Sequence, residues 1–187
     1  MNELQKFRTL NQLKSVYRAN SLAGRRESTA EHTWSALMLA DYFFSNIDQH
    51  LDKLKVYELL MYHDVVEIEA GDTPLDPANE ATGQQEKERL AAIKLKAQLP
   101  ARLQDKFLTL FHEFEAGQSP EARYAKAIDT LDAMVQGLDH KADWAGWTRE
   151  FVVSKKENLF TDFPQLLREF HKILDYLEQE GYFNQRG

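Results

Sequence analysis

The sequence predicts an all-α protein. Apolar residues recur every three or four positions through most of the chain, which is the spacing of a helix with one buried face. Helix-start signals, such as Ser28 with Glu31 and Ser119 with Pro120, precede two of these segments. No segment combines the alternating pattern of a strand with flanking turn residues. We therefore expect a helical bundle.

The first half of the chain contains three expected helices. An apolar stripe over residues 4–17 predicts an amphipathic helix that ends near Arg18. The second helix begins with the capping box STAE at Ser28 and extends to about residue 46. Asp52 is expected to cap the third helix, which should end near Gly71, where the turn-rich segment GDTPLDP is a candidate site loop.

The second half of the chain contains four more expected helices. Helices over residues 78–99 and 101–117 should lie on the outside of the bundle, since each carries many charges. Ser119 and Pro120 open a helix that extends to about residue 138, and a last helix is expected over residues 163–180. The aromatic residues between these last two helices are interpreted as packing residues.

Composition limits the class of protein. A chain of 187 residues is long enough for one hydrophobic core, so residues 1–187 are expected to form a single domain. The net charge of -7 argues against a nucleic-acid partner. There is no cysteine, no signal-peptide core and no uncharged apolar run of spanning length, so we expect a soluble cytoplasmic protein with no membrane partner.

Histidine and aspartate interrupt two of the apolar helices. A lone histidine is usually a core residue with satisfied ring nitrogens, and the remaining histidines receive that interpretation: His50, His112, His140 and His171. His32 and the doublet of His63 and Asp64 are different, because a buried carboxylate needs a positive partner. A divalent cation is one such partner for imidazole and carboxylate ligands, and Arg or Lys is the structural alternative.

These residues resemble a known family. The order His32, then His63 with Asp64, then Asp129 is similar to the H…HD…D signature of the HD-domain metal-dependent phosphohydrolases. The surrounding segments RRESTAEHTW, HDVVEIEAGD and HEFEAGQSPEARYAKAIDTLDAMVQ resemble the branch that includes bacterial 5'-deoxynucleotidases. The resemblance covers about residues 14–140, and the helices within residues 141–187 would complete an HD-type bundle.

The resemblance implies roles for individual residues. His32, His63, Asp64 and Asp129 match the ligands of one divalent metal ion, which could be Mn, Co, Fe, Ni, Zn or Mg. Glu67 matches the acidic residue of HDxxE, a general base or water-orienting group.

Residues on the substrate side follow from the same resemblance. Arg18 matches the arginine that binds the substrate phosphate, and Asp72 matches an aspartate near the substrate, although Asp72 is equally explained as a local turn cap. Lys126 lies one helical turn before Asp129 and could contact phosphate or balance the carboxylates, while Asp132, one turn after it, could orient a ligand or meet only solvent.

The implied activity is release of phosphate from a (deoxy)nucleoside 5'-monophosphate. A tryptophan follows the arginine in the deoxynucleotidase branch, but Ala19 follows Arg18 here, so we expect an open sugar-facing wall and weak discrimination between deoxy and ribo substrates. The alternatives are a pyrophosphohydrolase or phosphodiesterase of the same superfamily and a metal- or nucleotide-sensing module without turnover. A di-iron oxygenase is disfavoured, because His112 is the only histidine between the doublet and Asp129.

A homodimer is also expected, from the family resemblance and from apolar residues crowding one late segment. These residues are Trp144, Trp147, Phe151, Val152 and Val153. The alternative is that they cover the core of a monomer.

Overall fold

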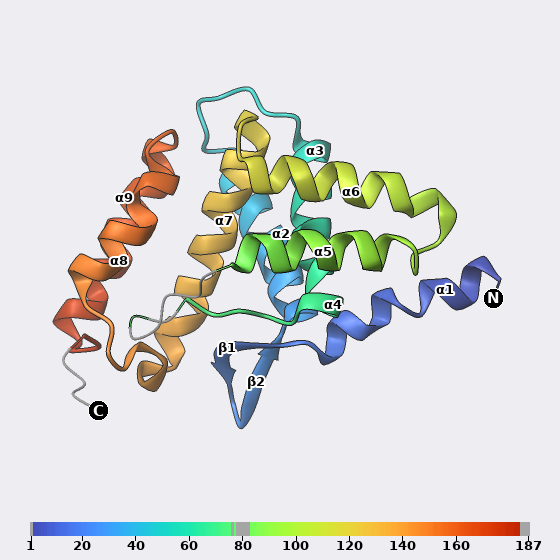
Figure 1. Ribbon diagram of the computed structural model, residues 1–187. Helices are drawn as coiled ribbons and strands as arrows, with labels where there is room; N and C mark the ends of the chain where they lie inside the picture. Colours follow the sequence, from blue (N-terminus) through green and yellow to red (C-terminus); the bar gives the residue numbers. More distant parts are fainter. Residues whose placement is uncertain (1, 76, 78–82, 184–187) are drawn as a thin grey trace.

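The computed structural model describes residues 2–75, 77 and 83–183. The described chain is mainly helical, with one small two-stranded sheet (Figure 1), so the all-α prediction is confirmed. The helices are α1 (Glu3–Phe7), α2 (Thr29–Phe44), α3 (Lys53–Tyr62), α4 (Glu67–Ala70), α5 (Gln84–Lys96), α6 (Ala101–Ala116), α7 (Pro120–Gln136), α8 (Arg149–Lys156) and α9 (Pro164–Gln179). Short 3-10 helices connect several of them: η1 (Leu10–Ser15), η2 (His63–Val66), η3 (Gly137–Asp139), η4 (Lys141–Trp144) and η5 (Glu157–Phe160).

The expectation of one helix over residues 4–17 is wrong. The helix α1 ends at Phe7, η1 follows, and the chain then forms the antiparallel hairpin of β1 (Tyr17–Leu22) and β2 (Arg25–Ser28). The apolar residues there recur every three positions, which is the period of a 3-10 helix rather than of an α-helix. Gly24, with φ of 82°, supplies the left-handed residue of the hairpin turn. Arg18 therefore lies on a strand.

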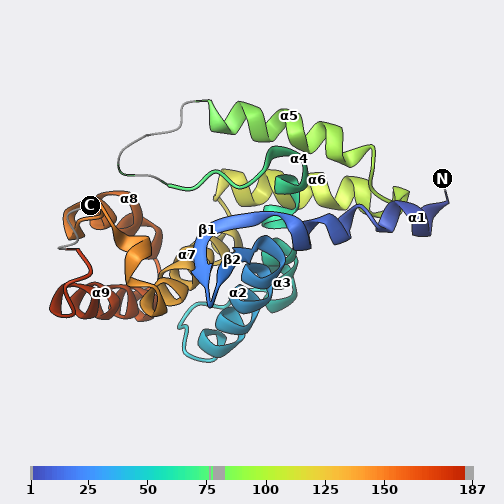
Figure 2. The ribbon, with the colours of Figure 1, turned by 90° about the horizontal axis from the view of Figure 1, so that it is seen from below.

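The central layer consists of α2, α3 and α7, which pack against one another. Both views show α5 and α6 on one side of these helices and α8 with α9 beyond α7 (Figures 1 and 2). The outer helix α6 covers α3 with a buried face, and its buried residues are Phe107, Leu110, Phe111 and Phe114. One cluster of buried apolar residues includes Leu13 near one end of the chain and Tyr182 near the other. This agrees with the single-domain assignment of residues 1–187, which stays a prediction.

Local helix signals are confirmed where the sequence carried them. Ser28 accepts a hydrogen bond from the Glu31 N–H in a complete capping box, Asp52 accepts from the Lys55 N–H, and Ser119 accepts from the Ala122 N–H. The predicted last helix corresponds to α9. The start predicted for the fourth helix lies outside the described residues, and α5 begins after Gly83.

The third predicted helix is interrupted where its polar doublet occurs. Helix α3 ends at Tyr62, the doublet begins η2, and α4 carries Glu67 before Gly71 ends the segment with φ of 72°. The change to a 3-10 geometry redirects the side chains of this segment relative to a continuous α-helix. No helix in the described ranges has the length and apolar character needed to cross a bilayer.

Candidate metal and phosphate site

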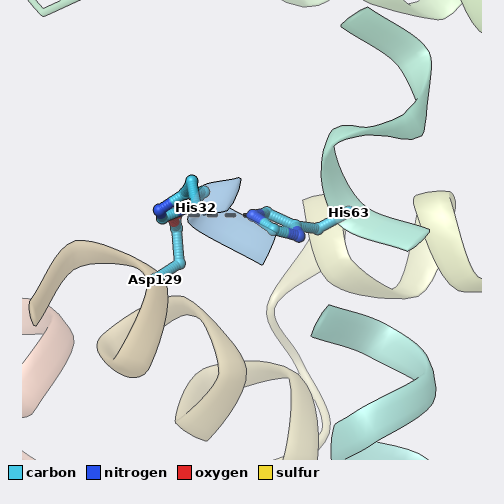
Figure 3. Close-up of side chains that lie close together, drawn as sticks. All are labelled: His32, His63 and Asp129. Carbon is cyan, nitrogen blue, oxygen red and sulfur yellow. Dashed lines mark hydrogen bonds and ion pairs between the residues drawn. The ribbon is translucent and has the colours of Figure 1, made fainter. Parts of the chain in front are cut away.

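Three side chains from three different elements converge at the centre of the bundle. His32 comes from α2, His63 from η2 and Asp129 from α7, and Figure 3 shows their polar atoms pointing toward one another. The candidate ligand atoms of these residues all lie within 4.8 Å of one another. Such a cluster of two imidazoles and a carboxylate can hold a transition metal ion.

The orientation of His32 is set by a carboxylate behind it. His32 Nδ1 lies 2.9 Å from Asp132 Oδ2, which also accepts a hydrogen bond of 2.7 Å from Ser35 Oγ. In neutral His32 the proton on Nδ1 is donated to Asp132, so Nε2 presents a lone pair. That Nε2 lies 2.9 Å from Asp129 Oδ1. Asp132 therefore orients the ring of His32, a candidate metal ligand, which agrees with one of its two sequence-based interpretations.

His63 has a matching arrangement. Its Nδ1 donates to the carbonyl oxygen of Leu60 at 2.7 Å, while its buried Nε2 has no hydrogen-bond partner among the described residues. This Nε2 lies 3.0 Å from Asp64 Oδ2 and 3.6 Å from Asp129 Oδ1. Two imidazole lone pairs thus face carboxylate oxygens, an arrangement that is unfavourable unless positive charge lies between them.

The carboxylates favour positive charge at this point strongly. Burial and the charge of Arg18 lower the pKa of His32, but hydrogen bonds to Asp129 and Asp132 outweigh them and raise it to about 9. The cluster thus attracts either protons or a cation. A divalent cation would neutralise the carboxylates of Asp64 and Asp129 and accept the Nε2 lone pairs of His32 and His63, while both imidazoles stay neutral. This set of donor atoms therefore fits a metal ion.

Asp64 has two partners besides His63. Its Oδ2 lies 3.8 Å from His32 Nε2, and it accepts a hydrogen bond of 2.9 Å from Arg18 Nη1. The arginine partner that the sequence left open as a structural alternative is therefore present. The metal interpretation still holds, because the single positive charge of Arg18 cannot neutralise the charges of both Asp64 and Asp129. The arginine also leaves the Nε2 atom of His63 without a hydrogen-bond partner in the part of the chain that the structure describes.

A second carboxylate accompanies Arg18 and was missed in the sequence. Glu27 on β2 is 3% exposed, and its Oε2 lies 3.7 Å from Arg18 Nε. Burial raises the pKa of Glu27, and Arg18 and His32 oppose that shift. Arg18 is thus held between two carboxylates, with its guanidinium beside the metal cluster. Only the hairpin pairing brings the two side chains together, so no spacing rule could have found Glu27.

Glu67 lies at the same cleft as Asp64 and Asp129. Thr29 Oγ1 donates a hydrogen bond of 2.7 Å to Glu67 Oε2. Burial, with the charge of Asp64, raises the pKa of Glu67 to about 8. Burial raises the pKa of Asp72, while the charge of Arg18 and interactions with the Ala19 N–H and the Glu67 carboxyl group oppose that shift. The two acidic groups therefore form a pair next to the cluster.

Lys126 reaches the cleft but not the cluster. Its Nζ lies 4.6 Å from the centre of the Phe114 ring and 3.9 Å from Glu115 Oε1. It lines the same hollow as Asp129.

The site opens into two hollows that meet at Arg18. The first, which we call the acidic cleft, is about 730 Å³ and is lined by His63, Asp64 and Asp129, by several glutamates and by Lys126. The second, which we call the side pocket, is about 230 Å³ and extends away from the cluster. Its walls come from β1, the segment after α4, the end of α7, the segment leading to α8 and the end of α8: Ala19, Asp72, Pro74, Leu75, Met134, Trp144, Trp147 and Lys156.

Two groups of sequence-based interpretations are wrong in detail. The four histidines interpreted as core residues are not buried: His50 and His112 are exposed, and His140 and His171 are half-buried. The aromatic segment is not an open apolar surface, because Trp144 is 6% exposed and Val152 is fully buried. Trp144 and Val152 pack inward, and Trp144 and Trp147 line the side pocket, so the segment gives no support to a homodimer.

Comparisons with known proteins agree with this geometry. A family described as HD domain matches residues 10–167. The 5'-deoxynucleotidase HDDC2 of Bos taurus is 28% identical over 145 residues, which are 75% of this chain and 68% of that protein. The 5'-deoxynucleotidase YfbR of Escherichia coli is 29% identical over 164 residues, or 83% of this chain and 80% of that protein.

A solved structure is similar over almost the whole chain. It is a predicted metal-dependent phosphohydrolase from Magnetospirillum magnetotacticum, with a TM-score of 0.80 at 28% identity, and the match covers 96% of this chain and 92% of the other. The family match begins at η1 and ends within α9, so it includes the hairpin, the cluster and both hollows. The resemblance seen in the sequence is confirmed, and the chain belongs to the HD domain family.

Proposed function

We propose that this protein is a metal-dependent phosphohydrolase that releases phosphate from nucleoside 5'-monophosphates. The observation that carries the proposal is the pair of imidazole Nε2 atoms facing the carboxylates of Asp64 and Asp129, next to the half-buried Arg18. Relatives named 5'-deoxynucleotidases support the substrate class. The coarser activity, phosphate-ester hydrolysis, also agrees with the similar phosphohydrolase structure.

The residues that would hold one divalent ion are His32, His63, Asp64 and Asp129. A bound ion of this kind supplies Lewis-acid polarisation of a phosphoryl oxygen and lowers the pKa of a water molecule. The candidate ions are Mn, Co, Fe, Ni, Zn and Mg, since imidazole and carboxylate suit each to some degree.

The other side chains perform binding and proton transfer. Arg18 offers a guanidinium fork to the phosphate oxygens, and Lys126 lines the same hollow. The carboxylate of Glu67 accepts the proton of the attacking water or orients that water. Asp72, which lines the side pocket and has a raised pKa, would hand a proton to the departing alcohol.

The two hollows differ in what they can accept. The acidic cleft is lined by Glu86, Glu88 and Glu115, whose charges would repel a second phosphate group. The side pocket carries apolar and aromatic walls, which suit a sugar and a base. This contrast favours a phosphomonoester with an organic leaving group over a pyrophosphate substrate.

A phosphate-release screen tests the proposal. The purified protein, loaded separately with each candidate metal, is assayed on deoxy- and ribonucleoside 5'-monophosphates, a nucleoside diphosphate and a bis-ester. We expect turnover of monophosphates with at least one metal, and none in an Asp129→Ala variant of unchanged fold. Turnover confined to the diphosphate or the bis-ester would replace this assignment by a pyrophosphohydrolase or phosphodiesterase. Nucleotide binding without turnover under every metal would indicate a sensing module.

Three expectations stay predictions. The cytoplasm is the expected location, and the absence of nucleic-acid and membrane partners is expected from charge and composition. A homodimer remains a prediction with a different physical basis, because α2 exposes an apolar stripe at four-residue spacing. The stripe consists of Trp34, Met38 and Tyr42, which are 67%, 55% and 67% exposed.

A further inference from the structure

Lys156, the last residue of α8, lines the side pocket opposite β1. Figure 2 shows α8 at the end of the molecule beyond α7, and η4 brings this region into contact with β1. The Nζ atom of Lys156 lies 5.7 Å from the centre of the Trp147 ring. Trp147 is itself held edge-on against Trp144 and Phe151, with ring centres 5.7 Å and 5.5 Å apart. The ammonium is thus positioned by an ordered aromatic group.

The ammonium of Lys156 has no carboxylate partner among the residues that the structure describes. The two carboxylates of the side pocket have other partners. Asp143 accepts two hydrogen bonds of 2.7 Å from Ser21, and Asp72 interacts with Glu67 and the Ala19 N–H. Burial lowers the pKa of Lys156 to about 8, against the opposing charge of Asp129. A half-buried cation in this setting gains by meeting an oxygen acceptor.

The position of Lys156 indicates which part of a ligand it meets. Arg18 belongs to both hollows and lies beside the cluster, so the phosphate end of a substrate is located there. Lys156 and Trp147 belong to the side pocket alone. A group attached to the phosphate and extending into the side pocket would present its own oxygen atoms to Lys156.

The same pocket corrects the expectation about Ala19. The sequence predicted an open wall, because no residue near Ala19 offers a ring in place of the missing indole. Trp147 lines the same pocket as Ala19, although it lies 128 positions later in the chain. The pocket therefore has an aromatic wall from a different element.

We propose that Lys156, held against Trp147, is a specificity-determining residue that donates a hydrogen bond to an oxygen of the nucleoside part of the substrate. The acceptor is a sugar hydroxyl or a base carbonyl, which share the chemistry of an uncharged oxygen acceptor. This inference rests on the proposed function for the identity of the ligand, but its binding test does not require turnover.

The test compares Lys156→Met with Lys155→Met in a metal-loaded Glu67→Gln background. Lys155 is an exposed neighbour on the same helix, and its Nζ also lies 5.7 Å from an aromatic ring, that of Phe151. Each variant removes one ammonium from α8, so the pair separates pocket position from overall charge. Dissociation constants are measured by titration with a purine and a pyrimidine deoxynucleoside monophosphate, with 2-deoxyribose 5-phosphate and with inorganic phosphate.

We expect Lys156→Met to weaken binding of the nucleotides by about tenfold or more, the usual scale for a hydrogen bond to a charged group. Lys155→Met should change it by less than about twofold, Lys156→Arg should recover part of the affinity, and phosphate binding should not change. If Lys156→Met also weakens binding of 2-deoxyribose 5-phosphate, the acceptor belongs to the sugar. If it weakens binding of the complete nucleotides alone, the acceptor belongs to the base.

Two results would overturn the inference. One is equal affinities for Lys156→Met and Lys155→Met. The other is an equal loss on inorganic phosphate, which would place Lys156 at the phosphate. Circular dichroism and metal content show whether each variant is folded and loaded, and Lys156→Arg serves if the methionine variant is not. Absence of phosphate release by the native protein would refute the proposed function, while the dissociation constants would still decide the role of Lys156.

Discussion

Replacing Asp132 by asparagine tests the metal cluster without touching any proposed ligand. Asp132 is 5% exposed, and its Oδ2 receives hydrogen bonds from His32 Nδ1 at 2.9 Å and from Ser35 Oγ at 2.7 Å. The Asp132 carboxylate fixes the His32 ring so that Nε2 faces Asp129. The negative charge of Asp132 also makes the imidazole more basic and therefore a stronger metal ligand. Asparagine keeps the size of the side chain but removes the charge.

The expected loss of metal affinity is about 10- to 100-fold, the usual effect of removing such a support. This corresponds to about 1.4–2.7 kcal/mol. The loss of one charge-assisted hydrogen bond, about 1.5–3 kcal/mol, gives the same range. Ser35→Ala should have a smaller effect in the same direction, because it leaves the contact between Asp132 and His32 in place.

The assay is a competition between the protein and a chelator of known affinity for Mn²⁺ or Co²⁺, at constant pH. Asp41→Asn is the control, since Asp41 is an exposed carboxylate on the same helix as His32 that pairs with Lys53. Its metal affinity should equal that of the native protein. An unchanged affinity in a folded Asp132→Asn protein would refute the reasoning, because His32 would then not depend on this carboxylate for its orientation.

Three further predictions concern the ligands and the substrate. Asp64→Ala should lose most of its metal by elemental analysis, since an anionic donor is removed; full occupancy in the folded variant would exclude Asp64 as a ligand. Glu67→Gln should keep its metal but release phosphate about 10²-fold more slowly, the scale of a general base, and unchanged turnover would remove Glu67 from the mechanism. Ala19→Trp should change the ratio of kcat/KM for deoxy and ribo substrates by about tenfold. Arg18→Ala should lower kcat/KM for both substrates by the same factor. A constant ratio in the Ala19→Trp protein would mean that position 19 does not face the sugar.

Local signals in the sequence were sufficient for the helical class and for most helix ends. The caps at Ser28, Asp52 and Ser119 act within one helical turn, so they are readable without knowledge of the rest of the chain. The order of the histidine and aspartate residues likewise indicates the family from sequence alone. Both kinds of information are carried by residue type and short spacing.

The tertiary structure decided what depends on contacts between distant segments. The hairpin forms because residues 17–22 find a partner in residues 25–28, and this pairing outweighs the helical pattern that precedes it. Glu27 and Arg18 meet only through that hairpin, and Asp132 meets His32 across 100 positions. Trp147 and Lys156 join Ala19 in one pocket for the same reason. Periodicity describes which face of an element is buried, but the partners on that face are set by how the elements pack.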